Sequence, residues 1–219
     1  MKGVTKMSLF VICGHGAGDC GAVGNGCEEA ERVRALAQRI KALGGNNVIV
    51  GDTSKNWYAS KLITTANIPK DAKILELHLD SSANISAKGG HVIIKKGLKA
   101  DKYDNALASF IGKMFAGRSS LIVERSDLAN PNRAHSKGYN YRLMECCFIS
   151  NKDDIVKFNN NLDAIAKGIL NAFEIPVSEP SETNKTIYRV QVGAFSKKEN
   201  AERLVSELKS KGYEAFITK

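Results

Sequence analysis

Five apolar runs rich in β-branched residues alternate with helix-like segments, and this alternation most constrains the fold. The runs are SLFVIC (8–13), NVIVGD (47–52), KILELHL (73–79), HVIIKK (91–96) and YRLMECCF (141–148). Between the first two, residues 28–43 carry apolar side chains at steps of three and four, which indicates an amphipathic helix. Helices are also expected around 101–115 and 160–173. The pattern predicts an α/β fold: a mixed, mostly parallel twisted sheet with helices on both faces.

The composition changes after Phe173. The stretch EIPVSEPSETNKT (174–186) contains two prolines, three acidic residues and several small polar residues, which is typical of an extended linker. We therefore expect a first domain at 1–175, a linker at 176–186 and a short segment at 187–219. That segment reads as strand, helix and strand, a β-α-β unit too small to bury a core of its own.

The chain is basic, with 32 Lys and Arg residues against 23 Asp and Glu residues, a formal net charge of +9. This balance favours a polyanionic partner such as nucleic acid, an anionic membrane or a cell wall that bears teichoic acid, without choosing among them. No run approaches the roughly 20 apolar residues of a membrane span, and the start MKGVTKMSLFVICGHG lacks a signal-peptide cleavage site. We expect synthesis in the cytoplasm without a signal peptide.

The segment ICGHGAGDCGAVGNGCEEAERVR (12–34) joins the first predicted strand to the first predicted helix and allows three interpretations. In the first, Gly16, Gly18 and Gly21 form a G-x-G-x-x-G phosphate loop, with Asp52 at the ribose position. That fingerprint starts its helix among the glycines, whereas here further residues precede the helix. A nucleotide-binding oxidoreductase is therefore disfavoured.

The cysteines of this segment allow a second interpretation, a metal site or a disulfide. They recur at intervals of seven (Cys13, Cys20 and Cys27), whereas structural zinc sites hold thiolates in close C-x₂₋₄-C pairs. The total of five cysteines is odd, and Cys146 and Cys147 are adjacent within a predicted buried strand. Reduced, buried thiols are favoured over a disulfide framework.

A third interpretation assigns the chemistry to polar residues beside strand ends and helix starts: His15, Glu29, His78 and Glu145. One such histidine is usually structural, but ligands of open α/β sheets gather at the carboxyl ends of strands, and four polar residues there favour a site. Two imidazoles and one carboxylate on a zinc ion leave its fourth position to water, whose proton a second carboxylate can accept. Three ligands and one base would account for all four residues.

These residues lie in motifs that resemble a known family. GHGAGDCGAVGNGCEEAERVR, LELHLDSS, GGHVII and LMECCFISN occur in the order and approximate spacing of the zinc-dependent N-acetylmuramoyl-L-alanine amidases of the Amidase_3 type, found in phage endolysins and bacterial autolysins. The resemblance spans about residues 8–173. It implies a zinc hydrolase that cleaves the amide between N-acetylmuramic acid and L-alanine in peptidoglycan. A zinc peptidase acting elsewhere in the stem peptide and a non-catalytic wall-binding protein are the alternatives.

The resemblance also implies roles for individual residues. His15, Glu29 and His78 would bind Zn²⁺, and Glu145 would be the catalytic carboxylate. Glu29 is preferred because the family's G-N-G-x-x-E motif places the ligand three residues after its last glycine, and Glu28 is the fallback.

Two positions depart from the family pattern. Asp80 stands two residues after the second histidine, where the family often has Asn, and Cys147 stands two residues after the catalytic glutamate, where the family usually has Gly. Asp80 is therefore a candidate for substrate binding. His135, in the predicted polar loop NPNRAHSKGYN (130–140), is another, whereas His91 on a predicted strand is expected to be structural.

The C-terminal segment 187–219 is similar to the first half of a SPOR repeat, a module that binds peptide-free glycan. A complete SPOR domain has the order βαββαβ, whereas the sequence here predicts only β-α-β. The resemblance implies peptidoglycan as the partner. The half-module is expected to come from a truncated chain, to pair with a partner such as a second copy or to be vestigial, and its attraction to the wall is expected to be weak. The enzyme would reach the wall after release or lysis, and no nucleic-acid partner is expected.

Overall fold

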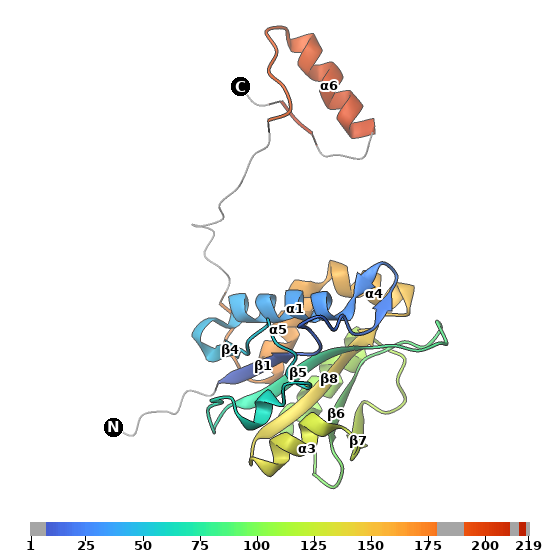
Figure 1. Ribbon diagram of the computed structural model, residues 1–219. Helices are drawn as coiled ribbons and strands as arrows, with labels where there is room; N and C mark the ends of the chain where they lie inside the picture. Colours follow the sequence, from blue (N-terminus) through green and yellow to red (C-terminus); the bar gives the residue numbers. More distant parts are fainter. Residues whose placement is uncertain (1–7, 179–190, 211–214, 218–219) are drawn as a thin grey trace. The chain divides into compact units, whose positions relative to one another are not determined.

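The computed structural model describes residues 8–178, 191–210 and 215–217 (Figure 1). It divides the chain into two units, Met1–Pro180 and Ser181–Lys219, and the division falls inside the predicted linker. The elements are β1 (Leu9–Cys13), β2 (Val23–Gly24), β3 (Cys27–Glu28), α1 (Glu29–Gly44), η1 (Gly45–Asn47), β4 (Val48–Val50), η2 (Leu62–Thr64), β5 (Lys73–Asp80), β6 (His91–Lys95), α2 (Lys102–Met114), β7 (Ile122–Arg125), α3 (Ala129–Ser136), β8 (Asn140–Phe148), α4 (Lys152–Asn160), α5 (Leu162–Ala172) and α6 (Lys198–Ser210).

A six-stranded sheet forms the centre of the first unit, with the strand order β4-β1-β5-β8-β6-β7. β4, β1, β5 and β8 run parallel to one another. β6 pairs antiparallel with β8, and β7 pairs in parallel with β6. This is the mixed, mostly parallel sheet that the sequence predicts, and the expected fold class is confirmed.

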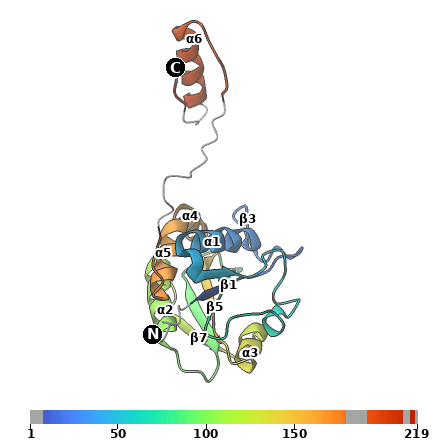
Figure 2. The ribbon, with the colours of Figure 1, turned by 90° about the vertical axis from the view of Figure 1, so that its left-hand side faces the viewer.

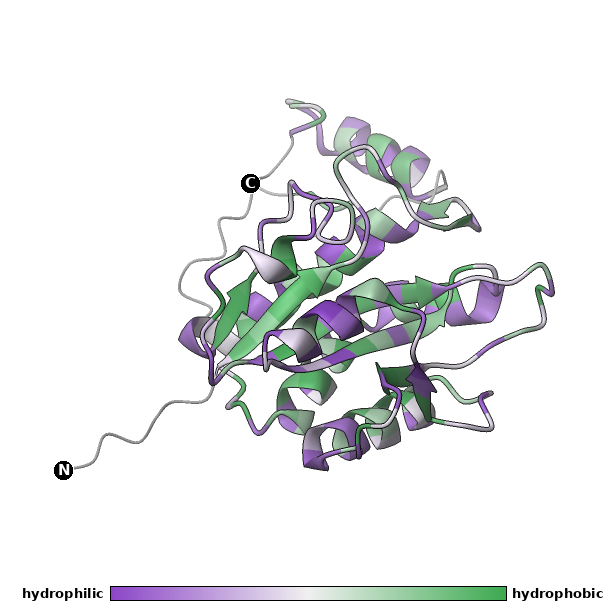
Figure 3. Cartoon of the chain, turned by 60° about the horizontal axis from the view of Figure 1, so that its bottom comes forward, coloured by the Kyte–Doolittle hydropathy of each residue, from purple (hydrophilic) through white to green (hydrophobic). Residues whose placement is uncertain are grey.

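The inner strands are apolar because helices cover both faces of the sheet. β1 is buried at every residue, and Figure 3 shows hydrophobic residues concentrated along the central strands. The polar side chains within these strands therefore stand out. Away from the strand ends they include Glu76 and His78 in β5, and Arg142 and Glu145 in β8.

Two hydrophobic clusters lie on the two faces of the sheet. On one face, α1 buries Val33, Leu36, Ala37, Ile40 and Leu43 together with residues of α2 and α5. On the other face, η2, α3 and the loop around Trp57 cover residues such as Phe10 and Ile74. Figure 2 shows α1 and α3 on opposite sides of the sheet.

The structure corrects the expectation of a polar loop at 130–140, because the first part of that stretch belongs to helix α3. The dipeptide Asn130-Pro131 resembles a turn signal, but Pro131 lies in the first turn of α3. The N–H groups of a first turn have no partner within the helix, so proline costs no hydrogen bond there. Sequence periodicity also missed α4 and the edge strand β7.

The packing of the first unit continues past the predicted domain boundary at Ile175. Ile175 is buried, Val177 packs against the core, and the Ser178 N–H donates to the Leu43 carbonyl at 2.8 Å. No helix among the described residues has the length and apolar character needed to cross a bilayer.

The second unit contains helix α6, as its stripe of apolar residues predicts. The expected flanking strands are not formed at the described positions 191–197 and 215–217, and the remainder of those strands lies outside the described residues. The backbone N–H and C=O groups of an extended segment need hydrogen-bond partners on a neighbouring strand, and a lone β-α-β unit offers few such partners. Val192 and Phe216 are accordingly 65% and 77% exposed.

Candidate metal centre

Three of the predicted residues converge where β1 and β5 end. His15 follows β1 by two residues, Glu29 is the first residue of α1, and His78 lies in β5. The Gly14 N–H donates to the Leu77 carbonyl at 3.0 Å, which extends the pairing of β1 with β5 and brings the His15 loop beside His78.

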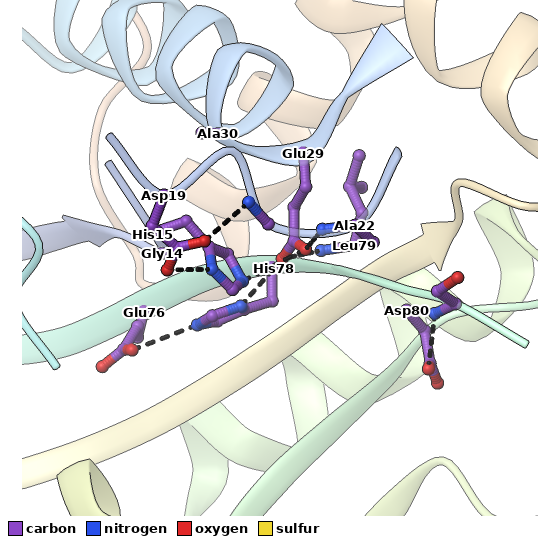
Figure 4. Close-up of polar contacts among 12 residues, drawn as sticks. Gly14, His15, Asp19, Ala22, Glu29, Ala30, Glu76, His78, Leu79 and Asp80 are labelled. Atoms are coloured by element: carbon purple, nitrogen blue, oxygen red, sulfur yellow. Dashed lines mark hydrogen bonds and ion pairs between the residues drawn. The ribbon is translucent and has the colours of Figure 1, made fainter. Parts of the chain in front are cut away.

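Glu29 lies between the two imidazoles (Figure 4). Its Oε2 is 3.1 Å from His15 Nε2, and its Oε1 is 2.8 Å from His78 Nδ1. Backbone N–H groups of Ala22 and Leu79 each donate to one of its oxygens at 3.0 Å. Backbone donors thus hold both oxygens of the carboxylate.

The adjacent Glu28 occupies a different environment. Its side chain is exposed at the end of β3, whereas Glu29 is only 3% exposed. Of the two acidic residues, the structure places Glu29 with the histidines.

The cluster fits a small cation with nitrogen and oxygen ligands. One potential ligand atom from each of His15, Glu29 and His78 lies within 4.8 Å of the others. Two glycines make room for the rings, because a Cβ on Gly14 would lie 2.4 Å from His78 Cε1 and one on Gly21 would lie 2.7 Å from His15 Cδ2. Two imidazoles and a carboxylate are the donor set of many catalytic zinc sites.

The electrostatics of the cluster also favour positive charge. A hydrogen bond to Glu29 raises the pKa of His15. Burial opposes charge on His78, but hydrogen bonds to Glu29 and Glu76 outweigh it and hold the pKa of His78 well above its usual value. Burial likewise opposes charge on Glu29, yet the two imidazoles lower the pKa of its carboxyl group. A divalent cation would displace protons that the site already attracts.

The second nitrogen of each imidazole also has a partner, which the sequence alone did not identify. His15 Nδ1 lies 2.9 Å from Asp19 Oδ2, and His78 Nε2 lies 3.1 Å from Glu76 Oε1. Glu76 precedes His78 by two residues and so shares its face of β5, which is the one sequence signal that pointed to it. Both contacts leave the remaining nitrogens, His15 Nε2 and His78 Nδ1, facing Glu29.

Glu145 lies on the neighbouring strand. It is the register partner of His78 in β5 and of His91 in β6. Its Oε2 is buried and has no hydrogen-bond partner. Burial raises the pKa of this carboxyl group to about 7. A carboxylate with a free oxygen and a pKa near neutrality is suited to accept and return a proton.

The two predicted substrate-binding residues lie elsewhere. Asp80 follows the irregularity at the end of β5 and forms an ion pair with Arg118. His135 is exposed at the end of α3 and lines a different pocket, beside Tyr139 and Arg142 near the start of β8. A cavity of about 280 Å³ adjoins His15 and His78, and neither Asp80 nor His135 lines it.

The other predicted residues are placed as follows. All five cysteines are free; Cys13, Cys146 and Cys147 are buried, whereas Cys20 and Cys27 are half-buried rather than buried as expected. His91 is 5% exposed at the start of β6. The glycine loop does not open a helix, because α1 begins only at Glu29, eight residues after Gly21.

The sequence matches a family of known enzymes. The model of the N-acetylmuramoyl-L-alanine amidase family matches residues 9–174, which is most of the chain. The chain belongs to this family. Its members are hydrolases, so the chain is an amidase of that class. The model of the SPOR domain matches residues 173–219 of the amidase.

Curated relatives agree with this assignment. The amidase is 31% identical over 188 residues to the probable autolysin PH of Staphylococcus aureus, an alignment that covers 77% of this chain and 38% of the autolysin. The chain thus spans well under half of that relative's length. It is 24% identical over 226 residues to the sporulation-specific N-acetylmuramoyl-L-alanine amidase of Bacillus subtilis, covering 96% of this chain and 84% of that protein.

Solved structures share the fold of the amidase. An N-acetylmuramoyl-L-alanine amidase from Clostridium difficile 630 superposes with a TM-score of 0.63 at 20% identity, covering 76% of this chain and 95% of that one. The catalytic domain of the CD27L endolysin, which targets Clostridia difficile, gives 0.61 at 21% identity, covering 78% and 99%. These similarities show that the chain shares the α/β fold of these structures.

Proposed function

We propose that this amidase is zinc-dependent and hydrolyses the bond between N-acetylmuramic acid and L-alanine in peptidoglycan. The observation that carries the proposal is the cluster of His15, Glu29 and His78, with Glu145 on the adjacent strand. His15 Nε2, His78 Nδ1 and the Glu29 carboxylate would hold the ion. A bound zinc ion would act as a Lewis acid that polarises the carbonyl group of the scissile amide and makes water a stronger nucleophile.

Glu145 would move the proton. Its free Oε2 would accept a proton from the attacking water as the new carbon–oxygen bond forms. The same oxygen would then return that proton to the leaving nitrogen as the carbon–nitrogen bond breaks. The products would be a lactyl carboxyl group on muramic acid and a stem peptide with an N-terminal L-alanine.

The second unit supports peptidoglycan as the partner. The SPOR match and the net charge of +9 both suit an anionic wall. Action on the wall after release or lysis is part of the proposal, and self-association through the C-terminal segment stays a prediction.

The test is the chemistry of the ends released from purified peptidoglycan. Free lactyl carboxyl groups together with N-terminal L-alanine support the amidase reaction, with Glu145→Gln protein as the matched control. A zinc peptidase would instead release other amino termini and leave L-alanine attached to muramic acid. The zinc part is tested separately, by the metal content of protein purified without added metal.

A further inference from the structure

Glu76 is a charged residue buried in the central strand β5, where an unpartnered carboxylate would be strongly destabilising. It is 3% exposed. Figure 4 shows it across the His78 ring from Glu29, so one imidazole separates the two carboxylates. Because one ring cannot bind a single ion through both nitrogens, Glu76 lies outside the group that would hold the metal.

Every oxygen of Glu76 is engaged by donors. The Tyr141 hydroxyl donates to Oε2 at 2.7 Å, and Asn130 Nδ2 lies 3.1 Å from Oε1 and 2.9 Å from Oε2. His78 Nε2 lies 3.1 Å from Oε1. Since Tyr141 and the Asn130 amide nitrogen act here as donors, Glu76 acts only as an acceptor. It has no free lone pair for a substrate proton, unlike Glu145.

The donors that surround Glu76 are themselves held in place. Asn130 is 2% exposed on α3, and its Oδ1 accepts a hydrogen bond from Arg133 at 3.0 Å. That contact fixes the orientation of the Asn130 amide, with its nitrogen toward Glu76. Helix α3 therefore connects to β5 through a polar network inside an otherwise apolar layer.

We infer that Glu76, held by Asn130 and Tyr141, is a positioning residue that keeps the proton of His78 on Nε2 and turns Nδ1 toward the metal site. A neutral imidazole carries one proton, and an acceptor fixed at Nε2 determines which nitrogen keeps it. The inference rests on the proposed function, since it concerns how one ligand is presented to zinc.

Asp19 provides the internal comparison. It accepts from His15 Nδ1 in the same way, but its side chain is 48% exposed, so water can replace it. Glu76 lines the cavity beside His15 and His78 but is only 3% exposed, so water reaches it far less than it reaches Asp19. The structure therefore predicts that the two carboxylates differ in importance: removal of Glu76 should weaken zinc binding much more than removal of Asp19.

The test compares Glu76→Leu, Glu76→Gln and Asp19→Asn by chelator competition for Zn²⁺ at fixed pH. We expect Glu76→Leu to weaken zinc affinity by a factor on the order of 10 to 100 and Asp19→Asn by a factor of roughly 3 or less. Nitrogen-15 NMR of the zinc-loaded wild type should show a slowly exchanging proton on His78 Nε2, and this signal should be lost in Glu76→Leu.

The outcomes separate the inference from the proposed function. Zinc affinity and an Nε2 proton signal in Glu76→Leu equal to those of wild type would overturn the positioning role while leaving the zinc site intact. Wild-type protein that binds no zinc would overturn the proposed function instead. If Glu76→Leu does not fold, Glu76→Gln decides in the same way, because it keeps the volume but brings an NH₂ group among donors that need acceptors.

Discussion

Glu145 lies directly opposite His78 in the parallel pairing of β5 with β8. Residues in register on neighbouring strands point to the same face of a sheet, so the free carboxylate oxygen of Glu145 belongs to the same side as the His15–Glu29–His78 cluster. The distance between Glu145, the proposed base, and His78, a proposed ligand, is therefore set by the spacing of β8 and β5 rather than by a mobile loop.

His78→Ala should remove most of the bound zinc. Two remaining ligands do not hold the ion tightly, so zinc should fall from about one equivalent per chain to a small fraction. Elemental analysis after gel filtration measures this. Glu28→Gln is the control, because Glu28 is adjacent in sequence to a proposed ligand but exposed. Retention of zinc by His78→Ala would contradict the ligand assignment.

Glu145→Gln should leave zinc bound and abolish most of the activity. The amide keeps the size of the side chain but does not accept a proton, so peptidoglycan hydrolysis should fall by a factor on the order of 10² to 10⁴. Metal content and release of N-terminal L-alanine are measured on the same preparation. Loss of zinc together with activity would make Glu145 a ligand, and near-normal activity would exclude a role for it.

Gly21→Ala should distort the His15–Glu29–His78 cluster by a steric clash, without changing its charge. A Cβ at Gly21 would lie 2.7 Å from His15 Cδ2 and 2.8 Å from Glu29 Oε2, whereas a Cβ at Gly26 meets no atom within 4 Å. Both glycines have positive φ, 69° and 74°, so alanine at either costs roughly 1–2 kcal/mol of stability. Gly26→Ala is thus a matched control for backbone strain.

Zinc titration of the two alanine variants distinguishes the effects. We expect Gly26→Ala to bind zinc as wild type does and Gly21→Ala to bind it at least tenfold more weakly. Equal affinities in the two variants would mean that the cluster tolerates the added methyl group.

The metal-free protein should lose stability as the pH rises toward neutrality, through Glu145. Burial raises its pKa from 4.5 to about 7, so the folded state prefers the protonated carboxyl group. The stabilising contribution is complete below about pH 4.5 and is lost as the pH rises through about 7. His78 and Arg118 oppose the shift, whereas Asp80 and Glu29 reinforce it.

The measurement is the free energy of unfolding in chelator, for wild type and for Glu145→Gln, across this pH range. The other titrating groups are common to both proteins, although the pKa of His78 also changes in the variant because Glu145 raises it. The difference, wild type minus variant, should fall between pH 4.5 and 7. A constant difference would show that Glu145 ionises in the folded protein as it does in the unfolded chain.

Deletion of the second unit should leave the catalytic unit intact. The cut belongs after Ser178, since Ile175 is buried and Ser178 bonds to Leu43. Zinc content and hydrolysis of soluble muropeptides should stay within about twofold of wild type, while retention on intact walls weakens. A truncated protein that is inactive on soluble substrate would place the C-terminal segment in the catalytic fold.

The sequence predicted the elements that carry strong periodicity. β1, β5, β8 and α1 follow from long apolar runs or a helical stripe, and their order brings His15, Glu29 and His78 to one edge of the sheet. Helix α3 was missed because Asn130-Pro131 reads as a turn. The spacing of apolar residues does not show whether a proline such as Pro131 ends a helix or lies in its first turn, where it is tolerated.

The finer features of the site depend on side-chain orientation, which spacing does not determine. Glu28 and Glu29 are adjacent, and only the start of α1 decides which of them turns inward. The contacts of Asp19 with His15 and of Glu76 with His78 depend on how each imidazole ring is rotated, which no sequence pattern predicts. His135 was a candidate because of its imidazole and its polar surroundings in the sequence. In the structure it lies at the end of α3 and lines another pocket.

The order of the strands in the sheet has a consequence for folding during synthesis. β8 is the last strand of the sheet to be synthesised, yet it lies between β5 and β6, which are both made earlier. A nascent chain that lacks β8 has neither Glu145 nor the strand that joins the two halves of the sheet. The sheet is therefore completed only when β8 has been synthesised, and fragments cut before β8 would lack both Glu145 and a continuous sheet.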